Sequence, residues 1–201
     1  TKWANEKEIP YEEMSVDDSL MIQAAEQTDV AIVVIGRAAG EDRENILEAG
    51  SYYLTEKETA LVEQVTKHFE KVVLIINSGN VMDLTWTEHY NFSAILFAWQ
   101  GGMESGNALA DLLVGDVNPS GKLPDTIARH YKDYPSSEHF GQEDFVEYVE
   151  DIFVGYRYFE TFHPEKVLYP FGYGLSYSKF SLDSKCIIEG TKLTLPPMSL
   201  M

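Results

Sequence analysis

The hydrophobic positions of this chain form three short unbroken runs, and each run is followed by a polar segment. Residues 30–35, 72–76 and 94–98 are apolar throughout and rich in branched side chains. Runs of this length are too short for a helix and are typical of strands that are buried on both faces of a parallel sheet. We therefore expect three such strands, and we expect the strand at 30–35 to be covered on both faces.

Two stretches outside the three apolar runs carry helical signals. Thr55 and Glu58 have the spacing of a capping box, and apolar residues follow at helical intervals as far as Phe69. Another helical segment covers about residues 104–114 and ends at Gly115, a residue favoured just after a helix. Strands that alternate with helices predict an α/β fold, a three-layer sandwich with a mostly parallel sheet flanked by helices.

Local signals predict three further features. Ser15 and Asp18 resemble a capping box at the start of a helix that leads into the first strand. Residues 118–121 (NPSG) predict a turn. Residues 152–159 alternate between aromatic and other side chains, which predicts a strand.

The charge balance restricts the classes of partner. The chain has 33 acidic and 15 basic residues and a formal net charge of -18, which repels phosphate backbones and anionic lipid. We therefore expect neither a nucleic-acid partner nor a membrane partner. The sequence also lacks an apolar run of about 18 residues that could span a bilayer, and it starts with no secretory-signal pattern. With a single cysteine, Cys186, these features favour a cytoplasmic location.

Most cofactor and nucleophile motifs are missing from the sequence. The segment 36–41 after the first strand lacks the G-x-G-x-x-G spacing, and no phosphate-binding loop or G-x-S-x-G motif occurs. The five histidines are scattered and form no metal-binding pair. We expect no cofactor and no metal. A flavodoxin-like ligand domain remains an alternative, and it predicts a flavin colour in the purified protein.

Carboxylates remain as candidate catalytic groups. In open parallel sheets, ligands bind beyond the carboxyl ends of the strands, and Glu41 follows the first strand there, with Glu44 and Glu48 on the same loop. Glycoside hydrolysis uses two carboxyl groups, one of which protonates the leaving oxygen. Any of the three glutamates is a candidate for that role. Asp83 follows a turn, where Asp commonly starts a helix, so we assign it a structural role.

A series of motifs covers about residues 28–180 and resembles, in its order, the C-terminal α/β-sandwich domain of family 3 glycoside hydrolases of the β-glucosidase type. The last three motifs are NPSGKLP, EDIFVGYRY and FGYGLSY, and they are specific when they occur together. The matching segments are 29–36, 40–43, 53–55, 72–79, 99–102, 118–124, 150–158 and 171–177.

The resemblance implies a retaining hydrolase that acts on a β-linked glucoside or oligosaccharide. Enzymes of this family pair an Asp nucleophile on a TIM-like barrel with a Glu acid/base on a loop of this second domain. By this resemblance Glu41 is the acid/base, and Asp42 and Arg43 match the Asp-Arg pair that follows it and binds substrate. Other members carry extra residues between the Glu and that pair, whereas all three residues are adjacent here.

The resemblance also divides the chain. Residues 1–14 are a lead-in, residues 15–180 form the α/β-sandwich domain, and residues 181–201 begin a following β domain of the fibronectin-III-like type. The barrel is missing from this chain and lies either upstream or downstream. The isolated chain should therefore be inactive. The alternative is a non-catalytic scaffold or sugar-binding domain with the same fold.

Overall fold

The computed structural model is built on a parallel sheet, and it describes residues 15–37, 46–140, 144–181, 187–189, 191–194 and 199–200. Strands β1 (Val30–Gly36), β2 (Lys71–Asn77) and β3 (Ala94–Phe97) are hydrogen-bonded in the order β1-β2-β3, and both pairings are parallel. The predicted α/β class and the predicted parallel strands are confirmed.

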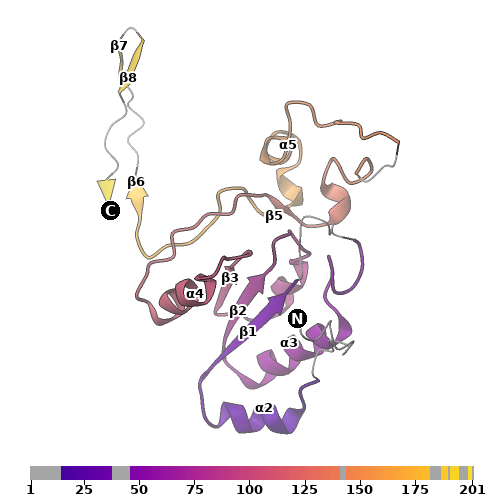
Figure 1. Cartoon of the computed structure of the whole chain (residues 1–201), viewed down its shortest axis with the longest axis vertical. Coiled ribbons are helices and arrows are strands. Elements are labelled where there is room, and N and C mark those ends of the chain that lie inside the picture. Colours follow the sequence, from indigo (N-terminus) through magenta and orange to yellow (C-terminus); the bar gives the residue numbers. More distant parts are fainter. Residues whose placement is uncertain are drawn as a thin grey trace.

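The helices lie around this sheet (Figure 1). Helix α3 (Glu56–His68) connects β1 to β2, helix α4 (Ser105–Val114) follows β3, and the strands lie between these two helices. Helix α2 (Asp18–Ala25) packs against α3. A helix that connects two neighbouring parallel strands is the arrangement that the alternating pattern predicts.

The predicted start of α3 and the predicted end of α4 are both confirmed. The Thr55 hydroxyl accepts a hydrogen bond from the Glu58 N–H at 3.0 Å, and the Glu58 carboxylate accepts one from the Thr55 N–H at 2.8 Å. This reciprocal pair satisfies two donors at the start of α3. Gly115 ends α4 in the left-handed conformation with φ 84°, which a glycine adopts without steric cost.

Helix α2 begins differently from the prediction. The residue that caps it is Asp17, whose carboxylate accepts a hydrogen bond from the Leu20 N–H at 2.8 Å. The capping box expected from Ser15 and Asp18 is therefore wrong. Asp17 is the capping residue because it has extended backbone directly before the first helical residue. From there its short side chain reaches the free N–H groups of the first turn.

The main hydrophobic core lies on one face of the sheet. Val33 and Ile35 of β1 are 4% and 1% exposed and pack in the same cluster as the inner residues of α3. Ile32 and Val34, which alternate with them, are 51% and 52% exposed. The prediction that the strand at 30–35 is buried on both faces is thus wrong for β1, because no described segment covers these two side chains.

The predicted strand at 152–159 is also wrong. Residues Tyr156–Phe162 form helix α5, which begins after Gly155 at φ 61°. Phe159 is 1% exposed, and its ring meets the Tyr134 ring edge-on with centroids 5.7 Å apart. The aromatic residues of this segment satisfy a helical spacing as well as an alternating one, and burial of Phe159 selects the helix.

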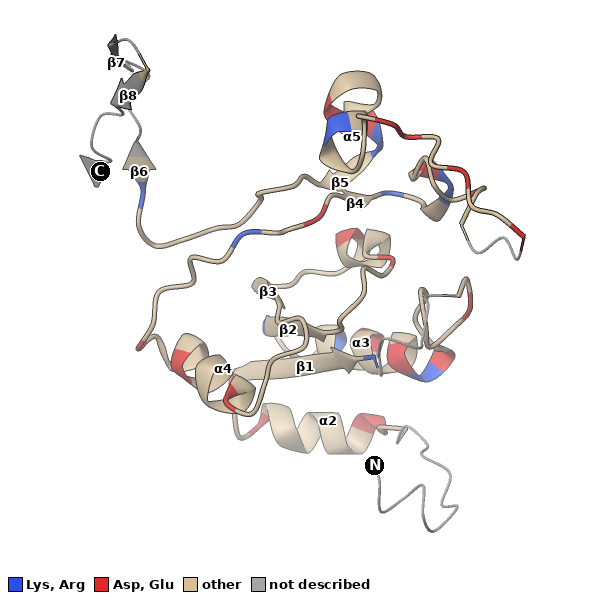
Figure 2. Ribbon diagram, turned by 45° about the horizontal axis from the view of Figure 1, so that its top comes forward, with Lys and Arg blue, Asp and Glu red and all other residues tan. Residues whose placement is uncertain are grey.

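The motifs at 118–124 and 171–177 lie side by side (Figures 1 and 2). The Leu123 N–H donates to the Tyr173 carbonyl at 2.8 Å, and the Asn118 side chain bonds to residues at the end of the second motif. The expected turn at 118–121 is wrong, since these residues run as irregular backbone along their partner segment. These motifs join distant parts of the chain, and we assign them no chemical role.

Acidic residues are spread over the helices and over the segment before α5 (Figure 2). Among the described residues, no helix has the length and the apolar character that a membrane crossing requires. The expected lead-in at 1–14 lies outside the described residues, and the β domain expected at 181–201 stays a prediction. The remaining elements are η1 (Thr85–His89), β4 (Ile127–Ala128), η2 (Tyr131–Asp133), η3 (Pro164–Lys166), β5 (Val167–Tyr169), β6 (Phe180–Ser181), β7 (Ile187–Glu189), β8 (Lys192–Thr194) and β9 (Ser199–Leu200).

Candidate functional site

The candidate site lies at the edge of the sheet where β1 and β2 end. Gly36 closes β1 opposite Asn77, and the Arg37 N–H continues the pairing by donating to the Asn77 carbonyl at 3.0 Å. The structure describes the chain up to Arg37, before the predicted catalytic loop, and again from Ile46, after it. The predicted site residues Glu41, Asp42 and Arg43, and the alternative Glu44, lie outside the described residues.

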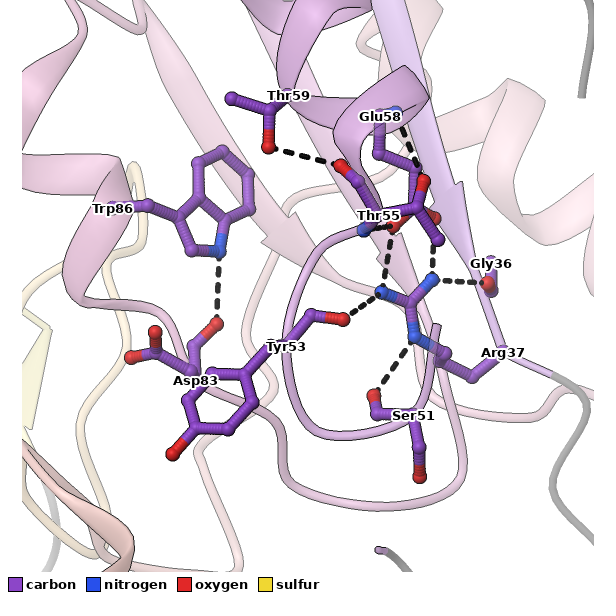
Figure 3. A network of polar contacts seen from close by, with 9 residues as sticks. All are labelled: Gly36, Arg37, Ser51, Tyr53, Thr55, Glu58, Thr59, Asp83 and Trp86. Carbon is purple, nitrogen blue, oxygen red and sulfur yellow. Dashed lines mark hydrogen bonds and ion pairs between the residues drawn. The ribbon is translucent and has the colours of Figure 1, made fainter. Parts of the chain in front are cut away.

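The Arg37 guanidinium is the centre of this edge (Figure 3). It donates two hydrogen bonds to the Glu58 carboxylate, at 2.5 Å and 2.9 Å. It also donates to three backbone carbonyls: that of Ser51 at 2.9 Å, that of Gly36 at 2.8 Å and that of Tyr53 at 3.1 Å. An Arg side chain has five N–H donors. All of them are used here, so one side chain joins the end of β1, the segment before α3 and α3 itself.

The Arg37–Glu58 pair is almost fully removed from solvent. The two side chains are 8% and 7% exposed. Glu58 stands in the first turn of α3, where the helix dipole favours a negative charge, and it also accepts the Thr55 N–H. Breaking a buried pair by removing one partner costs about 3–5 kcal/mol, since a charge remains without compensation. The pair therefore constrains this edge strongly.

Ser51 connects both flanks of the segment 38–45. Its carbonyl accepts the Arg37 Nε–H at 2.9 Å, and its hydroxyl accepts the Ile46 N–H at 3.1 Å. The Ile46 carbonyl in turn accepts the Tyr52 N–H at 3.2 Å. The turn is completed by Gly50 at φ 84°, a conformation that glycine adopts readily. The residues immediately before and after 38–45 are thus held on the same serine.

Glu48 is the one candidate proton donor that lies in the described part of the chain. It stands within the turn that Ser51 closes, and it is exposed. Its carbonyl accepts hydrogen bonds from the Ser51 N–H at 3.2 Å and from the Tyr53 N–H at 3.1 Å. Its backbone therefore serves the turn, and its side chain lies in solvent.

Tyr52 and Asp83 complete the frame. Tyr52 is 3% exposed, and burial raises the pKa of its hydroxyl, which keeps it neutral and unsuited to act as a base. The Tyr52 carbonyl accepts the Asp83 N–H at 2.9 Å. The Asp83 carboxylate accepts the N–H and the hydroxyl of Thr85 at 2.9 Å and 2.7 Å, just before η1. These bonds agree with a structural role for Asp83, although the residue that caps η1 is Leu84.

The described residues offer no cluster of three or more His, Cys, Asp or Glu side chains that could hold a metal ion. The residues of this edge that the sequence did not single out are Arg37 and Ser51. The sequence shows the two charges, because Arg37 is a cation directly after a predicted strand and Glu58 is an anion fixed by its capping box at the start of the next helix, but it does not show that they meet. That the two meet depends on tertiary structure across 21 positions.

Comparisons with known proteins point to one family. A family model described as the glycosyl hydrolase family 3 C-terminal domain matches residues 13–177. A β-glucosidase of Ruminococcus albus is 49% identical over 174 residues, which cover 87% of this chain and 18% of that protein. Beta-glucosidase A of Butyrivibrio fibrisolvens is 44% identical over 197 residues, with 85% and 24% covered.

Solved structures show the same similarity. The crystal structure of a β-glucosidase from Paenibacillus barengoltzii superposes with a TM-score of 0.85 at 47% identity, and the match covers 96% of this chain and 23% of that one. The chain thus spans about a fifth to a quarter of the length of the relatives it matches. The match to the family model extends across the whole edge described above, from Arg37 to Glu58.

Proposed function

Because the chain belongs to glycosyl hydrolase family 3 and carries its C-terminal domain, we propose that it is the acid/base-carrying domain of a retaining β-glycosidase. The bonds cleaved are O-glycosidic bonds of β-linked glucosides or oligosaccharides. The observation that carries the proposal is the pair of contacts by which Arg37 and Ile46, on the two flanks of residues 38–45, bind Ser51. This segment includes Glu41, it follows the carboxyl end of β1, and its two flanks are tied to Ser51.

In this mechanism Glu41 acts twice. It first gives its proton to the departing glycosidic oxygen while a second carboxylate attacks the anomeric carbon and forms a glycosyl-enzyme. It then removes a proton from the water that attacks this intermediate, which releases the sugar with its original configuration and restores both carboxyl groups. Asp42 and Arg43 contact the substrate beside it.

The second carboxylate belongs to a TIM-like barrel outside this chain. In retaining enzymes the two carboxyl groups stand about 5–5.5 Å apart, and protonation without nucleophilic capture leaves the oxocarbenium-like transition state unsupported. The 201-residue chain alone is therefore inactive on β-glucosides. Turnover by the purified chain, if it disappeared on Glu41→Gln, would contradict this part of the proposal.

A chimera tests the assignment of the proton donor. This chain replaces the aligned region of the Ruminococcus albus β-glucosidase, and Glu41→Gln is compared with Glu44→Gln and Glu48→Gln. Glu41→Gln should lower kcat/KM for an alkyl β-glucoside by about 10²–10⁴-fold, the usual contribution of general acid catalysis. It should have little effect on kcat/KM for 2,4-dinitrophenyl β-glucoside, because that leaving group departs without a proton.

Glu44→Gln and Glu48→Gln are the controls, and they also test the two alternative proton donors. If Glu44→Gln or Glu48→Gln shows the selective loss instead, the acid/base is that residue and not Glu41. If none of the three shows it, the domain is a non-catalytic scaffold, and the proposed function is wrong.

A further inference from the structure

We propose that Trp99 is a binding residue for sugar rings, a platform on which one unit of a β-linked glucoside stacks. The inference rests on the proposed function for the class of ligand alone, and it does not depend on where the proton donor lies. Trp99 belongs to the loop that leads from β3 to α4 (Figure 1).

Trp99 stands at the carboxyl edge of the sheet. Phe97 ends β3 in register with Ile76 of β2, and the Ala98 N–H still donates to the Ile76 carbonyl at 2.8 Å. Trp99 is the next residue, so it begins the loop at the point where the pairing stops. The carboxyl ends of parallel strands form the edge at which open sheets of this kind bind their ligands.

The backbone of Trp99 is strained. Its φ is 55°, in the left-handed region, where the Cβ atom of a bulky residue comes too close to the following carbonyl oxygen. Among the described non-glycine residues, only Trp99 and Asp151 have a positive φ, and aspartate tolerates this conformation better than tryptophan does. Strain of this kind persists where the surroundings enforce it, and it is concentrated at ligand-binding and catalytic sites.

Two close approaches hold the loop in this conformation. Gln100 packs on Gly79 of the loop after β2, where an added Cβ atom would lie 2.7 Å from the Gln100 side chain. Gly101 packs on Ser105 at the start of α4, where an added Cβ atom would overlap the Ser105 side chain. The loop is therefore held between the end of β2 and the start of α4, and the direction of Trp99 is set before a ligand binds.

Burial in the main core does not account for Trp99. Within the described part of the chain, Trp86 and Phe97 pack against that core, whereas Trp99 is outside it and only half-buried. The Phe97 ring lies against the Trp99 ring, with centroids 4.0 Å apart and planes tilted by 40°. A partly exposed aromatic ring that a second ring supports is suited to contact an apolar ligand surface.

The chemistry of the ring and the charge of the chain favour a sugar. The hydroxyl groups of a β-glucoside are all equatorial, so each face of its ring carries axial C–H groups. These C–H groups match the electron-rich face of an aromatic ring. Nucleic-acid bases also stack on aromatic side chains, but a net charge of -18 repels their phosphate backbone.

The test measures the binding of cellobiose to the purified 201-residue chain by saturation-transfer nuclear magnetic resonance. The C–H protons of cellobiose should receive saturation, and those of mannitol, which has hydroxyl groups but no ring, should not. Trp99→Gly and Trp99→Ala should both weaken the binding of cellobiose by about 10-fold, the upper end for an aromatic contact. In urea denaturation Trp99→Gly should be the more stable of the two, because glycine adopts a positive φ without steric cost.

Trp86→Phe is the matched control. The Trp86 ring meets the rings of Tyr90 and Phe92 edge-on, and its Nε1–H donates to the Asp83 carbonyl at 2.8 Å (Figure 3). This variant should lose stability and still bind cellobiose as the native chain does.

The inference would be overturned if the native chain did not bind cellobiose, or if Trp99→Gly bound it equally well. Equal stability of Trp99→Gly and Trp99→Ala would contradict the strain on which it rests; if Trp99→Ala does not fold, Trp99→Gly still decides the binding role.

Glu41→Gln in the chimera tests the proposed function separately. If that variant shows the selective loss and the Trp99 variants bind normally, the platform role alone is wrong. If binding depends on Trp99 and Glu41→Gln shows no selective loss, the platform role stands and the proposed catalytic function is wrong.

Discussion

At the residue scale, Glu58 has two partners: Thr55, which is close to it in the sequence, and Arg37, which is distant. Its N–H and carboxylate complete the capping box with Thr55, a local feature that the sequence predicts from a spacing of three residues. The same carboxylate binds Arg37, 21 positions away. One residue therefore starts α3 and anchors the edge at which the proposed proton donor is carried.

The cap can be tested apart from the ion pair. Thr55→Ala removes the hydroxyl that accepts the Glu58 N–H and should lower the free energy of unfolding by about 1 kcal/mol, measured by urea denaturation. Thr66→Ala is the matched control, because the Thr66 hydroxyl bonds back to the Val62 and Glu63 carbonyls within α3 and caps no helix end. It should be nearly neutral, since Ala is the better helix former. Equal losses in both variants would contradict the capping role.

At the element scale, Asp18 ties α2 to the end of α3. Its carboxylate contacts the His68 ring nitrogen at 2.8 Å and accepts from the Lys67 ammonium at 2.9 Å. The hydrogen bond from His68 and then that from Lys67 hold the pKa of Asp18 below its usual value of 3.8. A carboxylate whose pKa is lower in the folded state adds stability above the unfolded value and loses it as the pH falls through the folded value.

This sign gives a pH-dependent prediction. The unfolding temperature of the native chain should exceed that of Asp18→Asn at pH values well above 3.8, and the difference should shrink as the pH falls below 3.8. The measurement is thermal unfolding of both chains across this range. Asp29→Asn, a loss of the same charge on an exposed residue outside this contact, is the control and should show a smaller difference. A gap that stays constant at all pH values would exclude the proposed origin.

The elements also show what the sequence can and cannot predict. The strands and the start of α3 follow from unbroken apolar runs and from a local cap, so they were predictable. Helix α5 was not, because its aromatic residues fit two periods and burial of Phe159 against Tyr134 decides between them. The contact between Arg37 and Glu58 was not predictable either, because a contact between a strand end and a distant helix start leaves no periodic signal in the sequence.

At the scale of the whole molecule, one face of the sheet is well covered and the other is open along β1, whereas Ile75 of β2, which is in register with Val34, is 1% exposed. Val30, Ile32 and Val34 are 43%, 51% and 52% exposed, and no residue of α4 is buried. The apolar run at 30–35 predicts burial on both faces, and the structure shows burial on one. Within the part of the chain that the structure describes, no segment covers these side chains of β1.

The open face should be detectable in solution. The chain should bind a hydrophobic dye such as anilinonaphthalene sulfonate, as exposed apolar patches do. The double variant Ile32→Thr, Val34→Thr should bind less dye and keep its stability, because Thr suits a strand. Val33→Thr, one position away on the buried face, should lower the free energy of unfolding by about 1–3 kcal/mol, since it buries a hydroxyl. The same loss in both would show that the open face is covered.

The most direct measurement of the central claim is the identity of the product that Glu41→Ala forms in the chimera when azide is added. Removing the acid/base leaves room for azide to attack the glycosyl-enzyme from the side on which water normally attacks, without help from a base. The account predicts faster turnover of 2,4-dinitrophenyl β-glucoside and a β-glucosyl azide, identified by nuclear magnetic resonance. An α-glucosyl azide would identify Glu41 as the nucleophile, and the absence of any glucosyl azide would show that it has neither role.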